Sequence, residues 1–185
     1  MLAVSNFLEK KDLDTFLDFA YEFDKINTVP CLKSHWVLNS AGSTHNVTRI
    51  SPMKTHTVQA PYHSGISESL QNSLYDNLKN FWEKYSSALE QHGKSIIDES
   101  FSYSKFYLFF QYTDIEESYV FHSHPNESLV GVLYLYPEKS TGTIFKDTSM
   151  PWEVNKMVLF TGDVEHNFEN VNDRHKRFTL NFFMR

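Results

Sequence analysis

Residues 119–126 read Tyr-Val-Phe-His-Ser-His-Pro-Asn and place two histidines, His122 and His124, two positions apart. Side chains at positions i and i+2 of a β-strand point to the same face, so a strand here would bring both imidazoles to one side. Pro125 cannot continue a hydrogen-bond ladder and is expected to end that strand, which puts the pair at the mouth of a β-structure. Two histidines at this spacing are by themselves a weak signal of a metal site, because surface and hydrogen-bonded histidines are more common.

The sequence on both sides of this pair has the pattern of short β-strands. From Ser100 onward the hydrophobic period is two, and aromatic and β-branched residues gather in short segments that turn residues separate. The expected strands are 101–112, 118–123, 129–136, 142–146, 156–160 and 177–184. Many short strands at close spacing are typical of an antiparallel sandwich or barrel.

The N-terminal half has a helical pattern instead. Apolar side chains at helical spacing predict a short helix over 12–24, with Asp12 as its N-cap, and a longer one over 70–89, which Gly93 would stop. Residues 27–66 are irregular, with room for short strands and loops. We therefore expect a mainly β fold with α-helices in a single domain, 1–185, in which a helical and irregular part (1–99) buttresses a β core (100–185).

Composition narrows the function classes. The chain has 185 residues, of which 41% are hydrophobic and 16% aromatic, so it can bury a substantial core. The formal net charge of −6 argues against a protein that coats nucleic acid. No apolar run is long enough for a membrane helix, no signal peptide is evident, and Cys31 is the only cysteine, so we expect a cytoplasmic protein without disulfides or membrane attachment.

Two further features follow the histidine pair. An apolar strand ending at Phe160 leads through Gly162 to His166, a third candidate metal ligand. Arg177 then opens the last strand and shares a face with Thr179 by the same two-residue rule. An arginine on an aromatic strand is costly to bury without an anion, whereas the alternatives are a salt bridge to Glu165 or Asp163, or plain exposure.

The order of these motifs resembles the iron(II)/2-oxoglutarate-dependent oxygenases, in particular members whose first metal motif reads His-x-His-Pro, with prolyl-hydroxylase-type proteins as more distant relatives. The resemblance covers residues 112–182, somewhat over a third of the chain. It implies a double-stranded β-helix (jelly-roll) core and a dioxygenase that uses Fe(II), 2-oxoglutarate and O2. Such an enzyme would hydroxylate a C–H bond of a peptidyl side chain or small metabolite and release succinate and CO2.

The resemblance also implies roles for individual residues. His122 matches the first metal ligand and His166 the distal one, while Arg177 and Thr179 match the pair that holds the distal carboxylate of 2-oxoglutarate. Tyr134 and Tyr112 match tyrosines that reach this co-substrate. His124 stands where most of these enzymes have a carboxylate ligand, so the third ligand is His124 or, alternatively, Asp147 or Glu127.

Two other readings remain open at this stage. A cupin-type metal enzyme fits in part, because the spacing of Gly162, His166 and Asn170 is similar to the second cupin motif. A non-catalytic jelly-roll module would explain the strands and aromatic residues but not the ordered set of His, His and Arg.

Overall fold

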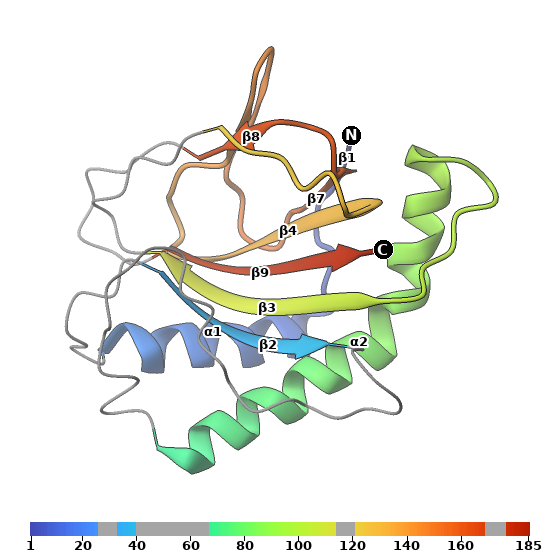
Figure 1. Ribbon diagram of the computed structural model, residues 1–185. Helices are drawn as coiled ribbons and strands as arrows, with labels where there is room; N and C mark the ends of the chain where they lie inside the picture. The colour runs from blue at the N-terminus through green and yellow to red at the C-terminus, as the bar shows by residue number, and fades with distance from the viewer. Residues whose placement is uncertain (26–32, 40–66, 114–120, 169–176) are drawn as a thin grey trace.

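The computed structural model describes residues 1–25, 33–39, 67–113, 121–168 and 177–185. Two α-helices and nine β-strands lie in these ranges (Figure 1). In chain order they are β1 (Leu2–Val4), α1 (Lys10–Lys25), β2 (Lys33–Asn39), α2 (Glu68–Ile96), β3 (Phe106–Thr113), β4 (Leu129–Tyr136), β5 (Thr143–Phe145), β6 (Ser149–Met150), β7 (Met157–Thr161), β8 (His166–Asn167) and β9 (Arg177–Met184).

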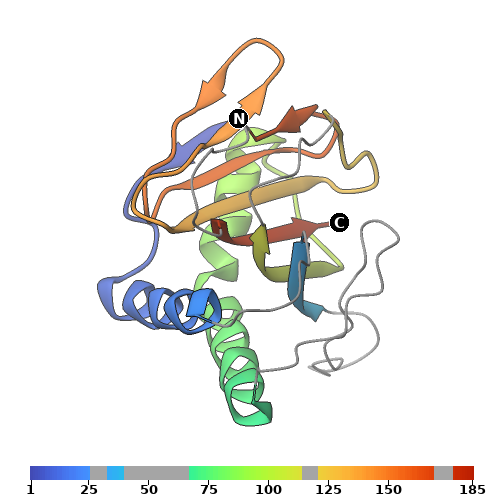
Figure 2. The same cartoon turned by 90° about the vertical axis from the view of Figure 1, so that its left-hand side faces the viewer.

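The strands form two antiparallel sheets, so the fold is mainly β with helices. The larger sheet has six strands in the order β1-β7-β4-β9-β3-β2, and the smaller has three in the order β6-β5-β8. Figures 1 and 2 show the smaller sheet stacked over one face of the larger one. Both edge strands of the larger sheet, β1 and β2, come from residues 1–99, so this N-terminal part also contributes to the sheet itself.

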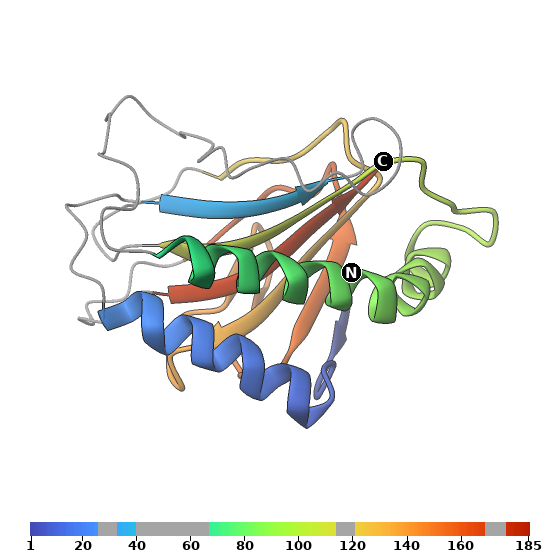
Figure 3. The same cartoon turned by 90° about the horizontal axis from the view of Figure 1, so that it is seen from below.

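Both helices cover the other face of the larger sheet, as the view from below shows (Figure 3). Because successive side chains of a strand point to opposite faces, β9 contacts the helices with one set of side chains and the smaller sheet with the other. Phe178, Leu180 and Phe182 are fully buried in the core between the sheet and the helices. The alternate positions of β9, which include Arg177 and Thr179, therefore face the smaller sheet.

A second, smaller apolar cluster fills the space between the two sheets. Its buried members are Val130, Tyr134, Phe145, Val158 and Phe160. Because this cluster comes from both sheets, it fixes the distance between them and so the shape of whatever lies between them. Among the described residues, neither helix has a stretch apolar enough to span a lipid bilayer.

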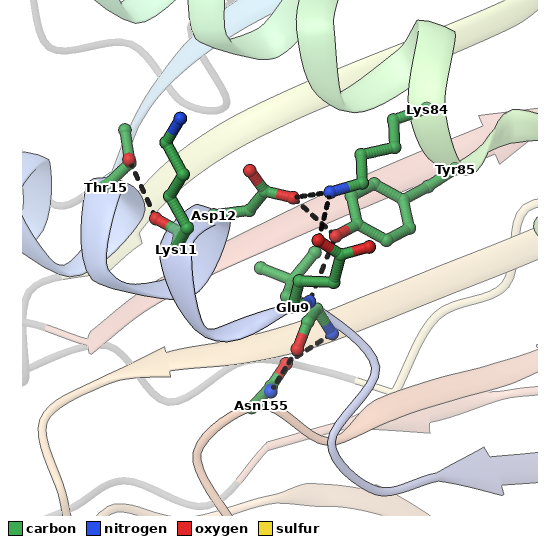
Figure 4. Close-up of polar contacts among 8 residues, drawn as sticks. Glu9, Lys11, Asp12, Thr15, Lys84, Tyr85 and Asn155 are labelled. Atoms are coloured by element: carbon green, nitrogen blue, oxygen red, sulfur yellow. Dashed lines mark hydrogen bonds and ion pairs between the residues drawn. The ribbon is translucent and has the colours of Figure 1, made fainter.

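Both helix ends predicted from the sequence are wrong in detail. Asp12 is not the N-cap of α1, which begins two residues earlier at Lys10. The Asp12 carboxylate instead accepts hydrogen bonds from Tyr85 Oη at 2.5 Å and Lys84 Nζ at 2.8 Å, both on α2 (Figure 4). The Tyr85 hydroxyl also accepts from the Glu9 backbone N–H at 3.0 Å. These contacts tie the start of α1 to the middle of α2.

Gly93 does not end α2, which continues to Ile96. A Cβ built on Gly93 would overlap the ring of Phe101 and lie 3.2 Å from Leu129 Cδ2. This glycine is therefore required by packing, because the chain returns across the helix at Phe101 before it enters β3. The predicted role as a helix stop was wrong for that reason.

Candidate functional site

Three histidines from two segments, 122–124 and β8, converge between the two sheets. The ligand nitrogens of His122, His124 and His166 all lie within 4.8 Å of one another. Their ring centroids are 4.5 Å apart for His122 and His166, 5.1 Å for His122 and His124, and 5.2 Å for His124 and His166. This is the only group of three potential metal-ligating side chains within the described residues.

Backbone hydrogen bonds, rather than a continuous strand, hold His122 and His124 beside His166. His122 pairs with His166 in an isolated antiparallel bridge, with N–H to carbonyl distances of 3.2 and 2.9 Å. His124 lies beyond that bridge, and its N–H donates to the Gly162 carbonyl at 2.6 Å. A Cβ on Gly162 would overlap the His124 and Glu127 carbonyl oxygens, so glycine is needed for this close approach.

The ring of His166 has a defined orientation. Its Nδ1 lies 3.0 Å from the Val164 carbonyl oxygen, which can only accept a hydrogen bond. Nδ1 therefore carries a proton, and in the neutral ring Nε2 carries the lone pair. The Phe160 ring packs 4.6 Å from the imidazole centroid, and only 8% of His166 is exposed. A histidine held in this tautomer by a carbonyl is the usual arrangement at metal sites.

The three histidines line a cavity of about 90 Å³. This volume can hold several water molecules or a small ligand. Besides the three histidines, the lining residues are Val130, Val132, Thr143, Asn167, Phe168, Arg177, Asn181 and Phe183. The cavity therefore combines apolar walls with imidazole, guanidinium, amide and hydroxyl groups, the mixture typical of small-molecule sites.

Arg177 places a cation in this largely buried site. Only 7% of the residue is exposed, and its Nε donates to the Thr141 carbonyl at 3.3 Å. Thr179, two positions along the same face of β9, is fully buried. Among the described residues, the Thr179 hydroxyl has no hydrogen-bond partner. The sequence alternatives for Arg177 included exposure near the chain end, which the burial of this side chain excludes.

Tyr134 supports the wall of the cavity from behind. Its hydroxyl donates to Thr143 Oγ1 at 2.8 Å and accepts from the Thr143 N–H at 2.9 Å. Burial raises the pKa of the Tyr134 phenol, which is only partly offset by hydrogen bonds from Thr143 and the charge of Arg177, so the hydroxyl keeps its proton. Thr143, which lines the cavity, is thereby held in one orientation.

The two carboxylates considered as alternative ligands lie elsewhere. Glu127 forms an ion pair with Arg185 at 2.7 Å, and Asp147 is exposed in the turn after β5, so neither belongs to the histidine group. Tyr112 lies on β3 with its Cα opposite Phe178, a residue of the helix-facing core. The Tyr112 side chain and Asn170 of the cupin-like spacing lie outside the described part of the chain.

Several residues in or near the cavity had no assigned role in the sequence analysis. Asn181 could have been recognised, because it shares the strand phase of Arg177 and Thr179. Phe168 and Trp152 approach Arg177 from the loops after β8 and β6, and no local sequence pattern indicates such contacts. They are visible only once the two sheets are stacked.

Comparison with known proteins supports the fold assignment. No protein-family model matches the chain, and neither does any curated protein sequence. A prolyl-4-hydroxylase from Pseudomonas putida superposes with a TM-score of 0.57 at 14% identity, covering 100% of this chain and 91% of that one. A Shewanella oneidensis protein provisionally described as an oxygenase gives 0.60 at 12% identity, covering 98% of this chain and 80% of that one. At these identities the likeness shows a shared fold.

Proposed function

We propose that this chain is an Fe(II)/2-oxoglutarate-dependent dioxygenase whose two sheets form a double-stranded β-helix. The observation that carries the proposal is the convergence of His122, His124 and His166 with the buried Arg177 on one cavity. A metal site alone would fit many enzymes, and a buried arginine alone would fit many anion sites. Both at one cavity suit a co-substrate with a chelating end and a distal carboxylate. The solved structures that share the fold include a prolyl hydroxylase, which favours the same chemistry.

The donor set fits a divalent first-row metal. Imidazole nitrogens are good ligands for iron, zinc, copper and nickel, and three such ligands would leave further coordination positions for other molecules. We assign His122, His124 and His166 as the ligands. All three are neutral when they bind, so the metal would keep its full double charge, and a dianionic co-substrate would neutralise it.

Arg177 and Thr179 fit a carboxylate. Arg177 offers a planar fork of donors that matches a carboxylate in a bidentate contact. The buried Thr179 hydroxyl is aligned with it on the same face, and a bound oxygen would relieve the cost of leaving that group without a partner, about 1–3 kcal/mol. Tyr134 acts indirectly by fixing Thr143, and the role of Tyr112, whose side chain lies outside the described part of the chain, stays a prediction.

The protein residues would contribute binding, orientation and exclusion of water. When bound, Fe(II) supplies the redox chemistry that couples the oxidative decarboxylation of 2-oxoglutarate to insertion of oxygen into a substrate C–H bond. Arg177 and Thr179 would orient the distal carboxylate, and the apolar walls formed by Val130, Val132 and Phe183 would keep water from the reacting groups. The substrate that we propose is a peptidyl side chain or a small metabolite.

Succinate release measures this activity directly. Purified protein with Fe(II), 2-oxoglutarate and O2 is screened against peptides and small metabolites, and we expect at least one of them to stimulate succinate formation. His122→Ala and His166→Ala should lose both Fe(II) binding and this activity. Both variants should keep the wild-type circular dichroism spectrum, because the histidines line a cavity and do not form the apolar core. Fe(II) affinity like that of wild type in either variant would contradict the ligand assignment.

A further inference from the structure

Three aromatic rings surround the Arg177 guanidinium. Its Cζ lies 4.7 Å from the ring centroid of Phe168, 5.1 Å from that of Trp152 and 5.8 Å from that of Tyr134. Cations within about 6 Å of an aromatic face are attracted by the electron-rich ring, most strongly for tryptophan and where water is excluded. Arg177 is 7% exposed, so these contacts operate in a largely dry environment.

Trp152 is itself held from two sides. Its Nε1 donates a hydrogen bond to the Pro137 carbonyl at 2.9 Å. Its ring stacks on Tyr134 with centroids 4.6 Å apart and an interplanar angle of 20°. Tyr134 is fully buried and is anchored by Thr143, so Trp152 rests on a fixed support.

The backbone around Gly142 brings Trp152 and Arg177 close to each other. A Cβ on Gly142 would overlap the Met150 carbonyl oxygen and lie 2.8 Å from the backbone nitrogen of Trp152. The backbone at Gly142 therefore touches the backbone of 150–152 without intervening side chains. The preceding residue, Thr141, provides the carbonyl that accepts from Arg177 Nε. One short connection therefore orients the guanidinium and positions the ring beside it.

We infer that Trp152 is a positioning residue for Arg177. It holds the guanidinium in the orientation that receives the distal carboxylate of the co-substrate. This inference rests on the proposed function, because it requires Arg177 to be the carboxylate receptor. Without the indole, the arginine gains water and additional rotamers, and binding must then restrict that freedom at a cost in affinity. Trp152 is not among the residues that line the cavity, so metal binding should not depend on it.

Calorimetric titration of 2-oxoglutarate into the Mn(II)-loaded protein tests this inference without turnover. We expect Trp152→Leu to bind 2-oxoglutarate about tenfold more weakly than wild type, with unchanged Mn(II) affinity. Trp152→Phe, which keeps a ring, should restore most of the affinity. The matched control is Trp82→Phe, because Trp82 stacks on Phe106 in the helix-facing core and should affect neither ligand.

Intrinsic fluorescence provides a second measurement that leaves Trp152 intact. The chain has three tryptophans, so Trp36→Phe together with Trp82→Phe leaves Trp152 as the only one. Its emission should change when 2-oxoglutarate is added to the Mn(II)-loaded protein, and should not change when Arg177→Ala is also introduced.

The outcomes separate the inference from the proposed function. If wild type and Trp152→Leu bind 2-oxoglutarate equally, the inference is overturned while the proposed function stands. An unresponsive Trp152 emission, or equal loss of Mn(II) and 2-oxoglutarate in Trp152→Leu, would also overturn it. If wild type with Mn(II) takes up no 2-oxoglutarate, the proposed function itself is contradicted.

Discussion

His124 decides the charge of the proposed metal centre. Its imidazole lies about as far from the other two rings as they lie from each other, and its backbone is bonded to the Gly162 carbonyl. A carboxylate at this position would contribute a negative charge, whereas a neutral imidazole contributes none. The predicted alternatives, Glu127 and Asp147, lie outside the group, which makes His124 the third ligand in our proposal.

Substitutions at His124 test this role. We expect His124→Asp to bind Fe(II) as tightly as wild type or more tightly, because a carboxylate retains a donor and adds an opposite charge. His124→Ala should bind Fe(II) at least tenfold more weakly, because it removes a ligand. Substituting residues that only hydrogen-bond to a ligand already lowers metal affinity by about tenfold or more. Competition against a chromogenic chelator measures both. If His124→Ala and His124→Asp both bind like wild type, His124 is not a ligand.

At the scale of the elements, the interior of α2 contains a glycine that packing requires. Glycine inside a helix is normally about 1 kcal/mol less favourable than alanine. At Gly93 we expect the opposite, because the Phe101 ring occupies the space of the missing Cβ and Leu129 lies close to it. The sequence pattern suggested a helix end here because the long-range contact with Phe101 is not encoded locally.

We therefore expect Gly93→Ala to destabilise the protein, by about 1–3 kcal/mol from overpacking, less the gain in helix propensity. Urea unfolding monitored by circular dichroism measures the free energy of unfolding. The control is Ser87→Ala on the exposed face of the same helix, which should be neutral or slightly stabilising. A Gly93→Ala variant more stable than wild type would contradict this prediction, because the Phe101 ring would then move aside without a loss of free energy.

The contacts between α1 and α2 have a defined pH dependence. Partial burial alone would raise the pKa of Asp12, but hydrogen bonds from Lys84 and Tyr85 outweigh it and hold the pKa below its ordinary value of 3.8. A carboxyl group with a lowered folded-state pKa contributes stability above its unfolded pKa. That contribution is lost as the pH falls through the folded-state value.

Tyr85→Phe removes the hydrogen bond to Asp12 and the acceptor of the Glu9 N–H, and should cost about 1–3 kcal/mol at pH 7. The stability difference from wild type should shrink below pH 3.8, as Asp12 takes up a proton. Urea unfolding at several pH values between 7 and 2.5 tests this. Tyr21→Phe is the control, because Tyr21 is 46% exposed on α1 and should show little difference at any pH. A Tyr85→Phe difference that stays constant with pH would contradict the role given to Asp12.

At the scale of the whole molecule, the long strands and the short strand β5 were readable from the sequence, whereas several other short strands were not. β4 and β9 coincide with the predicted segments 129–136 and 177–184, because each has eight residues rich in aliphatic and aromatic side chains, continuous in β4 and nearly alternating in β9. β1, β6 and β8 have two or three residues, too few to show a period. β2 mixes polar and apolar residues in Lys-Ser-His-Trp-Val-Leu-Asn and is defined by its pairing with β3.

The candidate site shows the same division. The spacing of His122 and His124 and the position of Arg177 on β9 pointed to three of the residues that line the cavity, since both are local features of the sequence. The close approach at Gly162 and the rings around Arg177 depend on how the two sheets stack, which only long-range packing determines. The sequence predicted that His122 and His124 lie on the same side of a strand. The two rings do lie close together, but an isolated bridge at His122 and a loop at His124 hold them there.

The central claim is that one cavity binds a metal through its histidines and a dicarboxylate through Arg177. The most direct test is an anaerobic titration of 2-oxoglutarate into the Fe(II)-loaded protein, followed by absorbance and calorimetry. The account predicts one 2-oxoglutarate per iron in wild type. It predicts roughly ten- to hundredfold weaker binding in Arg177→Ala with unchanged iron affinity, and an intermediate value in Arg177→Lys. Lys139→Ala, an exposed cation before β5, should behave as wild type. If 2-oxoglutarate binds Arg177→Ala as tightly as wild type, or does not bind the iron-loaded wild type, the account is contradicted.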